Sequence, residues 1–518
     1  MSTDYTSKKL AFNNAEQFKE SFFEPEPATI GYIFLANHIA WPNEDSPPTI
    51  SDTVSHEKEF WDSMYAAKKI TGNDVELVVP KMTWTANTKY REYDDTVDLA
   101  TLVTQNTASG YEPIYVINSE RNVYMCLNNN ASANSTIEPT GKNISANGIV
   151  QTADNYLWKY LYNVRASNRF LSNNWIPVPV NTSKLDYDTS SYITVEGELA
   201  KIVTTNIGSG YIHSTVTVSS FASGCTILTL ANTTNVAANM SVSGTGIPGG
   251  VHIESVDTVN TKITLSSATT AAGGGTGNNL SLTTRIYVDG DGTGTVALPT
   301  LNANGTIQKI TVTSYGKNYT RANVAIFGTG TDATARAVLP PKFGHAYNPA
   351  KELGASNVMI AMRIGEIDST EGGVISANTT FRQYGLLRDP YKYGTTTQVT
   401  TSTANSVISQ TTDITLISGT AYDRNEFVYQ GPSVADSTFS GYVHDYTTNI
   451  VRLTKVKGTI SVGSPLKGIS SNPSGRTVVT YSNPEFEPYT GDILYAENIV
   501  KVERTDGQAE NIKFVVRF

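Results

Sequence analysis

The sequence has little charge, few cysteines and no long apolar run. Only 16% of its 518 residues are Asp, Glu, Lys or Arg, against about 25% in an average globular domain, so long charge-rich helices are not expected. It has no run of five basic residues and its net charge is −9, which argues against nucleic acid as a partner. No stretch of 18 apolar residues occurs, so neither a membrane span nor a membrane partner is predicted.

The first residues and the two cysteines indicate a compartment. The segment Met1–Tyr5 lacks the basic and apolar regions of a secretory signal. Cys126 and Cys225 are far apart in the sequence. We therefore expect a protein of the reducing cytoplasm with two free thiols.

Small polar residues, glycine and tyrosine take the place of charge. The chain has 40 Gly, and its 28 Tyr outnumber its 16 Phe and 5 Trp together. Such a composition favours strands and turns, and Tyr suits half-buried sheet faces and protein interfaces. The predicted fold class is mainly β and multi-domain, with a discontinuous β-sandwich-like core, a few short helices and inserted β-modules.

Local patterns predict two helices and several strands. Residues 13–23 place Phe18 and Phe22 on one helical face, and residues 55–69 carry an apolar stripe of Phe60, Met64 and Ala67. The strands that we expect in the first third are 30–35, 75–79, 114–117, 123–127 and 156–164.

An internal repeat marks the middle of the chain. Residues 201–218 match residues 309–326 at a constant offset of 108 (309 minus 201), and each copy reads as strand, Gly turn, Tyr and strand. The second copy continues directly into Gly328–Gly330, whereas the matching Gly290–Gly292 of the first copy comes much later. We therefore expect a nested β-module at 220–283 that splits the first copy.

These patterns predict a core in three pieces with two insertions. Residues 1–192, with an N-terminal helix or arm, form the first part of the core. Residues 193–338 form an inserted β-domain of two related halves, and 339–398 form the second part of the core. Residues 399–480 read as a small SH3-like barrel, and 481–518 complete the core.

No catalytic constellation is recognisable, so we expect no enzyme, no cofactor and no metal site. Nucleophile elbows, zinc-binding helices and phosphate loops are all missing, and the six histidines stand singly. Asp289–Gly292 resembles the start of a calcium loop, but Thr300 stands where the loop needs a Glu. One alternative stays open: Tyr and Gly loops could stack on sugars in a carbohydrate-binding or glycan-degrading tail protein, which as an enzyme would need two flanking carboxylates.

Several short segments, taken in order, resemble a known family. They are Tyr32–Leu35, Trp41-Pro42, Phe60–Met64, Val123–Leu127, Thr136–Pro139, Asp154–Leu161, Gly344–Pro349, Phe381–Gly385 and Thr490–Asn498. Together they cover both sides of the insertions and are similar to the baseplate wedge subunit of T-even-like contractile-tailed phages, the gene product 8 family. The family-like positions that we expect to be structurally important are Trp41, Trp61, Glu138, Pro139, Trp158, His345, Phe381, Arg382, Gln383, Glu497 and Asn498.

This resemblance implies a structural protein. It implies a mostly-β fold, a homodimer within each wedge, contacts with other wedge subunits, and no catalysis or cofactor. It places the chain in the tail baseplate of the virion after assembly in the host cytoplasm, with a role in baseplate assembly and tail-contraction signalling. The insertions at 193–338 and 400–480 depart from the compact family member. Contact of the insertions with tail fibres or the host surface, and binding of a glycan or metal ion, remain open.

Overall fold

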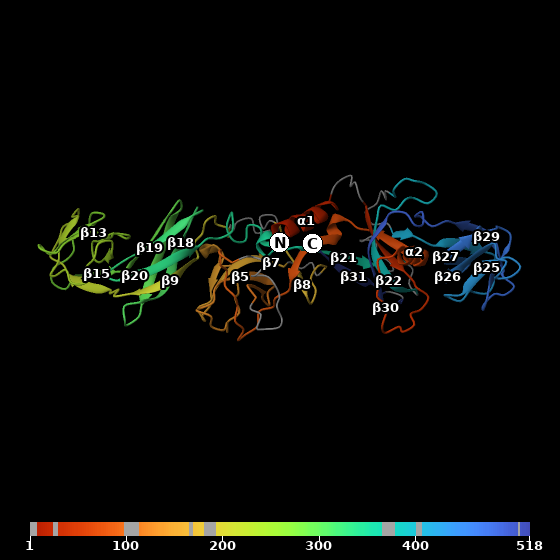
Figure 1. Ribbon diagram of the computed structural model, residues 1–518, viewed down its shortest axis with the longest axis horizontal. Coiled ribbons are helices and arrows are strands. Elements are labelled where there is room, and N and C mark those ends of the chain that lie inside the picture. The colour runs from red at the N-terminus through yellow and green to blue at the C-terminus, as the bar shows by residue number, and fades with distance from the viewer. Residues whose placement is uncertain are drawn as a thin grey trace, which may run out of the picture. The chain divides into compact units, whose positions relative to one another are not determined.

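The computed structural model is mainly β and multi-domain, as the sequence predicts (Figure 1). It describes residues 8–23, 30–97, 113–164, 169–180, 193–364, 375, 379–399, 407–505 and 508–518. The described helices are short: α1 (Lys8–Glu20), α2 (Val54–Ser63), α4 (Pro349–Glu352) and the 3-10 turns η1 (Gly72–Asp74) and η2 (Ile144–Ala146). The chain forms two compact units, which we describe separately: unit 1 holds chiefly 79–168 and 172–355, and unit 2 holds 10–78, 169–171 and 356–518.

The first part of unit 1 is an antiparallel sheet in the order β4-β5-β7-β6. Its strands are β4 (Tyr115–Ile117), β5 (Asn122–Asn128), β6 (Ile149–Gln151) and β7 (Leu157–Asn163), and the short β8 (Trp175–Pro177) follows. Large aromatic side chains fill its core, where the ring of Tyr90 meets that of Trp158 edge to face at 5.3 Å. This dense aromatic packing explains why the sheet strands read as nearly continuous apolar runs in the sequence.

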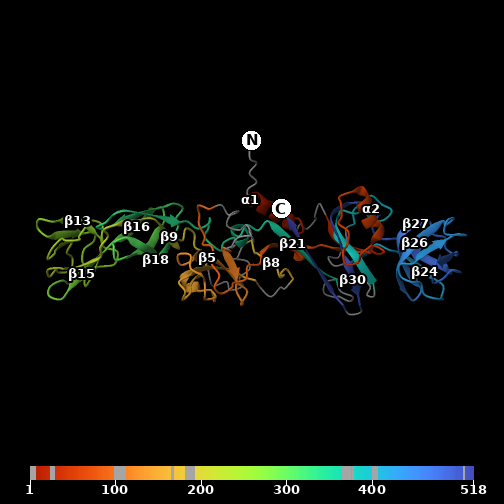
Figure 2. The ribbon, with the colours of Figure 1, turned by 60° about the horizontal axis from the view of Figure 1, so that its bottom comes forward.

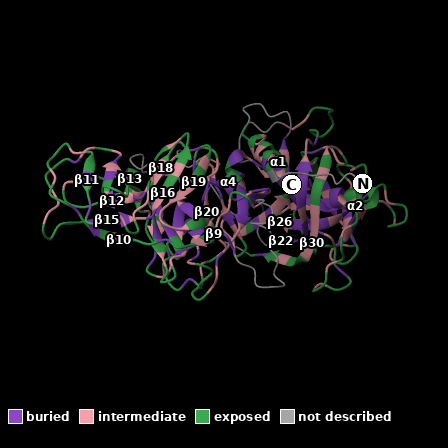
Figure 3. Cartoon of the chain, turned by 60° about the vertical axis from the view of Figure 1, so that its left-hand side comes forward, coloured by how far each residue is buried: buried purple, intermediate pink, exposed green. Residues whose placement is uncertain are grey.

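The second part of unit 1 is the repeat domain, residues 197–211 and 285–338. One sheet has the order β16-β19-β20-β9, and β17 pairs with β18. The strands are β9 (Lys201–Ser209), β16 (Arg285–Gly290), β17 (Thr293–Leu301), β18 (Ile307–Lys317), β19 (Ala322–Phe327) and β20 (Thr331–Val338). A single apolar cluster that includes Ile202, Tyr211, Ile310 and Tyr319 lies between them. Exposed and half-buried residues dominate these strands (Figure 3).

The two copies of the repeat pair in the same register. In β20 and β9, Thr331 lies opposite Ser209, and in β17 and β18, Thr293 lies opposite Lys317. Thr331 follows its equivalent Thr293 by 38 residues (331 minus 293), and Lys317 follows its equivalent Ser209 by 108 residues (317 minus 209). Both ladders also shift register at the matching place, between Thr334 and Ala335 and between Val296 and Ala297. Each copy therefore supplies a strand to the ladder of the other.

Equivalent turns lock the two copies together. Tyr211 of the first copy packs over Gly328 and Gly330 of the second, and Tyr319 of the second packs over Gly290 and Gly292 of the first. A Cβ at Gly292, Gly328 or Gly330 would strike the ring, and one at Gly290 would strike the carbonyl of Arg321. The turns repeat the same hydrogen bonds: Ile212 N donates to Thr329 Oγ1 at 3.0 Å, and Thr320 N donates to Asp291 Oδ1 at 2.9 Å. The residues that resemble a calcium loop therefore form the end of β16 and the bend after it. Hydrogen bonds from Thr320 and Arg321 hold the pKa of Asp291 well below its usual range.

The nested module begins earlier than the repeat suggests. Its strands are β10 (Ser214–Thr217), β11 (Ile227–Thr229), β12 (Ser241–Ser243), β13 (Ile253–Asp257), β14 (Lys262–Leu265) and β15 (Asn279–Thr283). They form two three-stranded sheets, β10-β15-β12 and β11-β14-β13, around one apolar core to which Val216 and Val218 belong. Ile286 and Val288 of β16, not Val216 and Val218, therefore correspond to Val324 and Ile326 of the second copy. An alternating apolar strand looks the same in either setting, and this misplaces the predicted start at 220.

Unit 2 contains a five-stranded antiparallel sheet made from distant segments, in the order β23-β2-β1-β22-β30. Its strands are β1 (Gly31–Ala36), β2 (Met64–Lys69), β22 (Thr379–Arg388), β23 (Val407–Ser409) and β30 (Asp492–Arg504). A second sheet contains β3 (Val75–Pro80), β21 (Asn357–Ile364) and β31 (Glu510–Arg517). The terminal strand β31 is paired along its whole length with β21, as the apolar run Phe514–Val516 predicts.

A closed barrel is inserted between β23 and β30 (Figure 2). Its strands, in the order β24-β27-β26-β25-β28-β29, are β24 (Thr412–Leu416), β25 (Phe427–Gln430), β26 (Phe439–Thr447), β27 (Ile450–Gly458), β28 (Pro465–Gly468) and β29 (Arg476–Ser482). Its interior is a separate apolar core that includes Ile414, Val428 and Leu453. Helix α2 packs against β27 and β1, so the barrel lies beside the five-stranded sheet.

Two sequence expectations differ from the structure. The helix predicted at 55–69 ends at Ser63, and Met64–Lys69 forms β2, because pairing with β1 and β23 outweighs the helical propensity of Met, Ala and Lys. The core predicted as one body is divided: β22, β30 and β31 join residues 31–80, whereas the sheet of 115–163 belongs to unit 1. Aromatic strands alone do not reveal which sheet they join.

Candidate functional site

The family-like residues of unit 2 gather around the middle of β22. This strand carries Phe381, Arg382 and Gln383, and its neighbour β30 carries Glu497 and Asn498. Trp41 comes from the segment that follows β1 and lies beside the same two strands, because its indole nitrogen donates to the carbonyl of Ile499 at 2.9 Å. Only tertiary structure brings these segments together, since they are far apart in the sequence.

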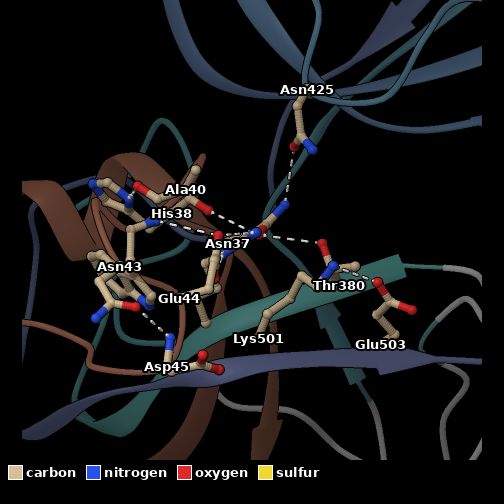
Figure 4. Close-up of polar contacts among 12 residues, drawn as sticks. Asn37, His38, Ala40, Asn43, Glu44, Asp45, Thr380, Asn425, Lys501 and Glu503 are labelled. Carbon is tan, nitrogen blue, oxygen red and sulfur yellow. Dashed lines mark hydrogen bonds and ion pairs between the residues drawn. The ribbon is translucent and has the colours of Figure 1, made fainter.

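Arg382 is the centre of this site. Its side chain is buried, and it donates from Nη2 to Glu44 Oε1 at 2.7 Å, from Nη1 to Asn37 Oδ1 at 3.2 Å and from Nη1 to the carbonyl of His38 at 3.1 Å. We call Asn37, His38, Glu44 and Arg382 the Arg382 network. Figure 4 shows Asn37 between Thr380 of the sheet and Asn425 of the barrel, to which its amide donates at 3.3 Å. One buried guanidinium thus orders the loop after β1 and reaches the side chain that contacts the barrel.

Strand β30 bulges opposite Arg382. Gln383 pairs with Asn498, but the next pair is Phe381 with Val502, so residues 499–501 face a single residue of β22. Within the bulge, the Trp41 indole donates a hydrogen bond to the carbonyl of Ile499. Lys501 forms an ion pair with Glu503 at 2.5 Å. β30 is the last strand of its sheet in the described chain, and bulges and charges of this kind keep a sheet edge from adding another strand.

Gln383 extends the polar contacts to the other side of the sheet. Its amide oxygen accepts from Ser63 Oγ at 2.9 Å, and its amide nitrogen donates to Asn498 Oδ1 at 2.9 Å. Asn498 in turn donates to the carbonyl of Pro48 at 2.9 Å. A chain of neutral hydrogen bonds therefore joins the end of α2, the sheet and the loop after β1.

His38 and Trp41 close the outer side of the site. Their rings stack at 4.3 Å, and His38 Nε2 lies 2.7 Å from Glu59 Oε1 on α2. Burial, with the positive charge of Lys455, lowers the pKa of His38.

Glu497 binds two tyrosines. The hydroxyls of Tyr384 and Tyr495 both donate to its Oε2, that of Tyr495 at 2.7 Å. Burial and the negative charge of Glu497 raise the pKa of Tyr495 to about 12 and that of Tyr384 further. Both phenols stay protonated at neutral pH and serve as donors to the carboxylate.

The other predicted positions do not join this site. Trp61 lies in the apolar core below the sheet, together with Phe34 and Phe486. Four positions belong to unit 1: Trp158 is buried, Glu138 accepts from Ser119 N at 2.7 Å, Pro139 accepts from Asn118 at 2.8 Å, and His345 Nδ1 lies 2.5 Å from Glu352 Oε1. These four residues therefore have local structural roles in unit 1.

Sequence analysis missed several polar residues that hold distant segments together. It gave no role to Glu44, Asn37 or Ser63, because nothing local distinguishes a loop carboxylate that meets an arginine of a distant strand. It also missed the buried pair of Lys159 and Glu198, whose Nζ and Oε2 atoms are 2.7 Å apart. Here a signal was present, since a single Lys within the apolar run Tyr156–Val164 needs a partner if the strand is buried.

The side chains of this site hold separate segments of the chain together. Hydrogen bonds from Arg382 lower the pKa of Glu44, which makes this carboxylate a weak base. Burial raises the pKa of the Cys126 thiol, and both cysteines are free. Among the described residues, no three His, Cys, Asp or Glu side chains are grouped so as to hold a metal ion. The part of the chain that the structure describes also contains no helix of the length and apolarity needed to cross a membrane.

No protein-family model matches the sequence, and no curated protein matches it.

Proposed function

We propose that the chain is a structural subunit of the baseplate wedge of a contractile phage tail. It acts through contacts with other wedge subunits in baseplate assembly and tail-contraction signalling, and it is assembled in the host cytoplasm. The observation that carries this proposal is that Trp41, Arg382, Gln383 and Asn498, four residues of three family-like segments, meet at the paired strands β22 and β30. Segments that resemble a family in order and also pack together support a shared fold better than any one motif does.

The surface of unit 2 fits a role in assembly. Tyr391, Tyr393 and Tyr489 expose 36%, 38% and 55% of their surface, and the backbone holds their segments side by side, since Tyr391 N donates to Thr490 Oγ1 at 3.0 Å. Exposed Tyr is typical of interfaces, because one end of the ring is apolar and the other forms hydrogen bonds.

Immunoelectron microscopy of the particles that carry this protein tests its location. Purified particles are labelled with an antibody against the barrel, residues 412–482, and with a second antibody against the capsid. We expect the first label at the end of the tail away from the capsid. Label on the capsid, or purified particles without the protein in mass spectrometry, would contradict the proposal.

We further propose that the chain is a homodimer whose contact lies in the aromatic, charge-poor part of the core. An obligate dimer of this size buries on the order of 2,000 Å² in total. Light scattering of the purified chain should give twice the mass of one chain. Tyr391→Lys with Tyr393→Lys should shift the mass toward the monomer, because a two-fold contact would bring like charges together. The matched control is Val259→Lys, at a residue of the nested module that is 89% exposed. A monomeric parent chain, or a dimer lost only in the control, would contradict this proposal.

The proposed role includes no catalysis. Incubation with a panel of host polysaccharides and peptidoglycan should release no product. Turnover that disappears when one carboxylate is replaced by its amide would favour the glycan-degrading alternative.

A further inference from the structure

The repeat domain joins the rest of unit 1 through two connections, before β9 and after β20, and charged residues gather at both. The innermost contact is the pair of Lys159 on β7 and Glu198 ahead of β9, whose side chains are 0% and 1% exposed. Lys159 Nζ also donates to the carbonyls of Asn147 at 2.6 Å and Ile193 at 2.9 Å, and the Asn147 amide donates to Glu198 at 2.9 Å. We call this contact the pivot.

Further out, acidic residues of the segment 92–95 bind two cations of the repeat domain. Lys201, at the start of β9, pairs with Glu92. Arg336, near the end of β20, binds Asp94 at 2.6 Å and Asp95 at 2.7 Å. Asp95 also accepts from Leu339 N at 3.0 Å. These five charged residues, Glu92, Asp94, Asp95, Lys201 and Arg336, are the latch, and the side chains that face Arg336 remain partly exposed.

The duplication provides an internal comparison for these charges. The shared register gives the residue of the β17–β18 ladder that is equivalent to each charged residue at the joint. Thr306 corresponds to Glu198, Lys309 to Lys201 and Leu298 to Arg336. At that end of the domain the chain simply turns, with Thr306 N donating to Asn302 Oδ1 at 2.9 Å. Lys309 and Leu298 are exposed there. Since the β17–β18 ladder lacks the Glu and the Arg and still pairs in the register of the β9–β20 ladder, this pairing does not require these charges.

We propose that the pivot and the latch form a two-part joint that fixes the direction of the repeat domain and its nested module. The buried pivot holds the domain in place, because separating a fully buried ion pair leaves an uncompensated charge. The latch, in which every side chain except Lys201 is partly exposed, holds one orientation, because ion pairs at such positions are weak alone and screened by salt. Opening the latch frees the domain to swing while both sides of the joint stay folded. This joint is a property of the chain itself and does not depend on its place in a baseplate.

A distance measurement across the joint in the full-length chain tests this proposal. Spin labels are placed at Thr140→Cys in the first part of unit 1 and Val259→Cys in the nested module, both exposed positions, in a Cys225→Ser background. Cys126 stays, because burial makes it inert. Pulsed electron resonance should give one narrow distance distribution at low salt. Lys201→Glu with Arg336→Glu should broaden it, and about 1 M salt, at which the screening length is about 3 Å, should broaden that of the parent chain.

The duplication supplies the control, and a charge exchange supplies the rescue. Lys309→Glu changes the equivalent lysine of the other copy and should leave the distribution narrow. Glu92→Lys combined with Lys201→Glu should narrow it again relative to Lys201→Glu alone. A broad distribution in the parent chain, no change in the latch variant, or equal broadening by Lys309→Glu would overturn the proposal.

Hydrogen exchange separates an open latch from an unfolded domain. In the latch variant, the amide of Leu339, which donates to Asp95 across the joint, should exchange roughly 3- to 10-fold faster, as expected from the loss of a few partly exposed ion pairs. Amides of β14 and β5 should keep their protection. If the double variant unfolds β14 or β5, Arg336→Gln replaces it as the milder test. Unchanged exchange at the joint in Arg336→Gln then counts against the latch.

Discussion

The barrel of unit 2 and the repeat domain of unit 1 are both insertions, and their attachments use different chemistry. At the base of the barrel, the Gln410 amide donates to the Phe486 carbonyl at 3.2 Å and accepts from Phe486 N at 3.1 Å. The ring of Tyr65 from the sheet stacks on His444 of the barrel at 3.9 Å. The repeat domain is instead held by the charges of the pivot and the latch.

This difference separates two ways to hold an inserted domain. Stacked rings and a buried amide respond little to salt, and the Gln410 amide ties the two connections of the barrel to each other. Ion pairs specify one orientation strongly when buried and weakly when exposed. The comparison predicts that unit 1 is sensitive to charge at its joint, whereas unit 2 is sensitive to the protonation of one histidine.

The largest effect is expected at the pivot. Lys159→Met leaves Glu198 buried without a partner and should lower the free energy of unfolding by roughly 3–5 kcal/mol. Adding Glu198→Leu should recover most of the loss, because an apolar pair needs no counter-charge. Urea unfolding measures both. The free energy of unfolding of the control Lys309→Met should stay within about 0.5 kcal/mol of that of the parent chain. An equal loss in Lys309→Met and Lys159→Met would contradict the special role of the buried lysine.

The pH dependence of unit 2 should follow His444. Burial, with Arg424, Arg452 and Arg504 nearby and Asp445 opposing them, lowers the pKa of His444 to about 4. The unfolded chain, with a histidine pKa near 6.5, binds the proton first as pH falls. Stability is therefore full above about pH 6.5 and declines toward pH 4, by roughly 3 kcal/mol.

Unfolding curves of the parent chain and of His444→Phe between pH 4 and 7 isolate this contribution. In the variant, the free energy of unfolding should change less steeply with pH, because the contribution of His444 is lost. The carboxylates titrate alike in both proteins, so their contribution to the slope is the same. Identical slopes would show that the ring is solvated or charged in the folded protein.

A smaller effect is expected at the base of the barrel. Gln410→Ala leaves the Phe486 N–H and carbonyl without a partner and should cost roughly 1–3 kcal/mol. Hydrogen exchange should show this loss first at residues 409–411 and 485–487. Gln308→Ala, at an exposed position of β18, is the matched control. If Gln410→Ala speeds exchange far from the barrel base, the hydrogen bonds between Gln410 and Phe486 do not act locally.

The smallest effect is expected when the nested module is removed. The second copy runs from Thr320 to Asn323 through Arg321 and Ala322, so residues 213–284 can be replaced by Arg-Ala to join Ile212 to Arg285. The melting temperature should change by no more than about 2–4 °C, equivalent to about 1 kcal/mol. Loss of exchange protection in β9 or β20 would show that the module is needed to hold the repeat domain together.

Sequence reasoning succeeded where the pattern was local. The strands at 31–36, 75–80 and 122–128, the closed barrel near residues 412–482 and the 108-residue offset were all readable. Each depends on alternation, turn residues or direct repetition.

What failed depended on contacts between distant segments. Residues 64–69 have helical composition and become a strand because partners exist on both sides. Arg382 and Gln383 were chosen from a resemblance, yet their partners Glu44 and Ser63 come from loops and helix ends that carry no signal of their own. The start of the nested module was misplaced because Val216 and Val218 fit either of two sheets.

The bulge of β30 has a consequence for the chain during synthesis. This strand is 13 residues long and ends its sheet in the described chain. Newly made copies on one messenger emerge side by side, and a long straight edge would capture the same strand of a neighbour and seed a fibre. The bulge at residues 499–501 makes the spacing of the backbone donors and acceptors along this edge irregular. The Trp41 indole also donates a hydrogen bond to the carbonyl of Ile499. Each copy can therefore finish folding alone before its side-chain surfaces meet another chain.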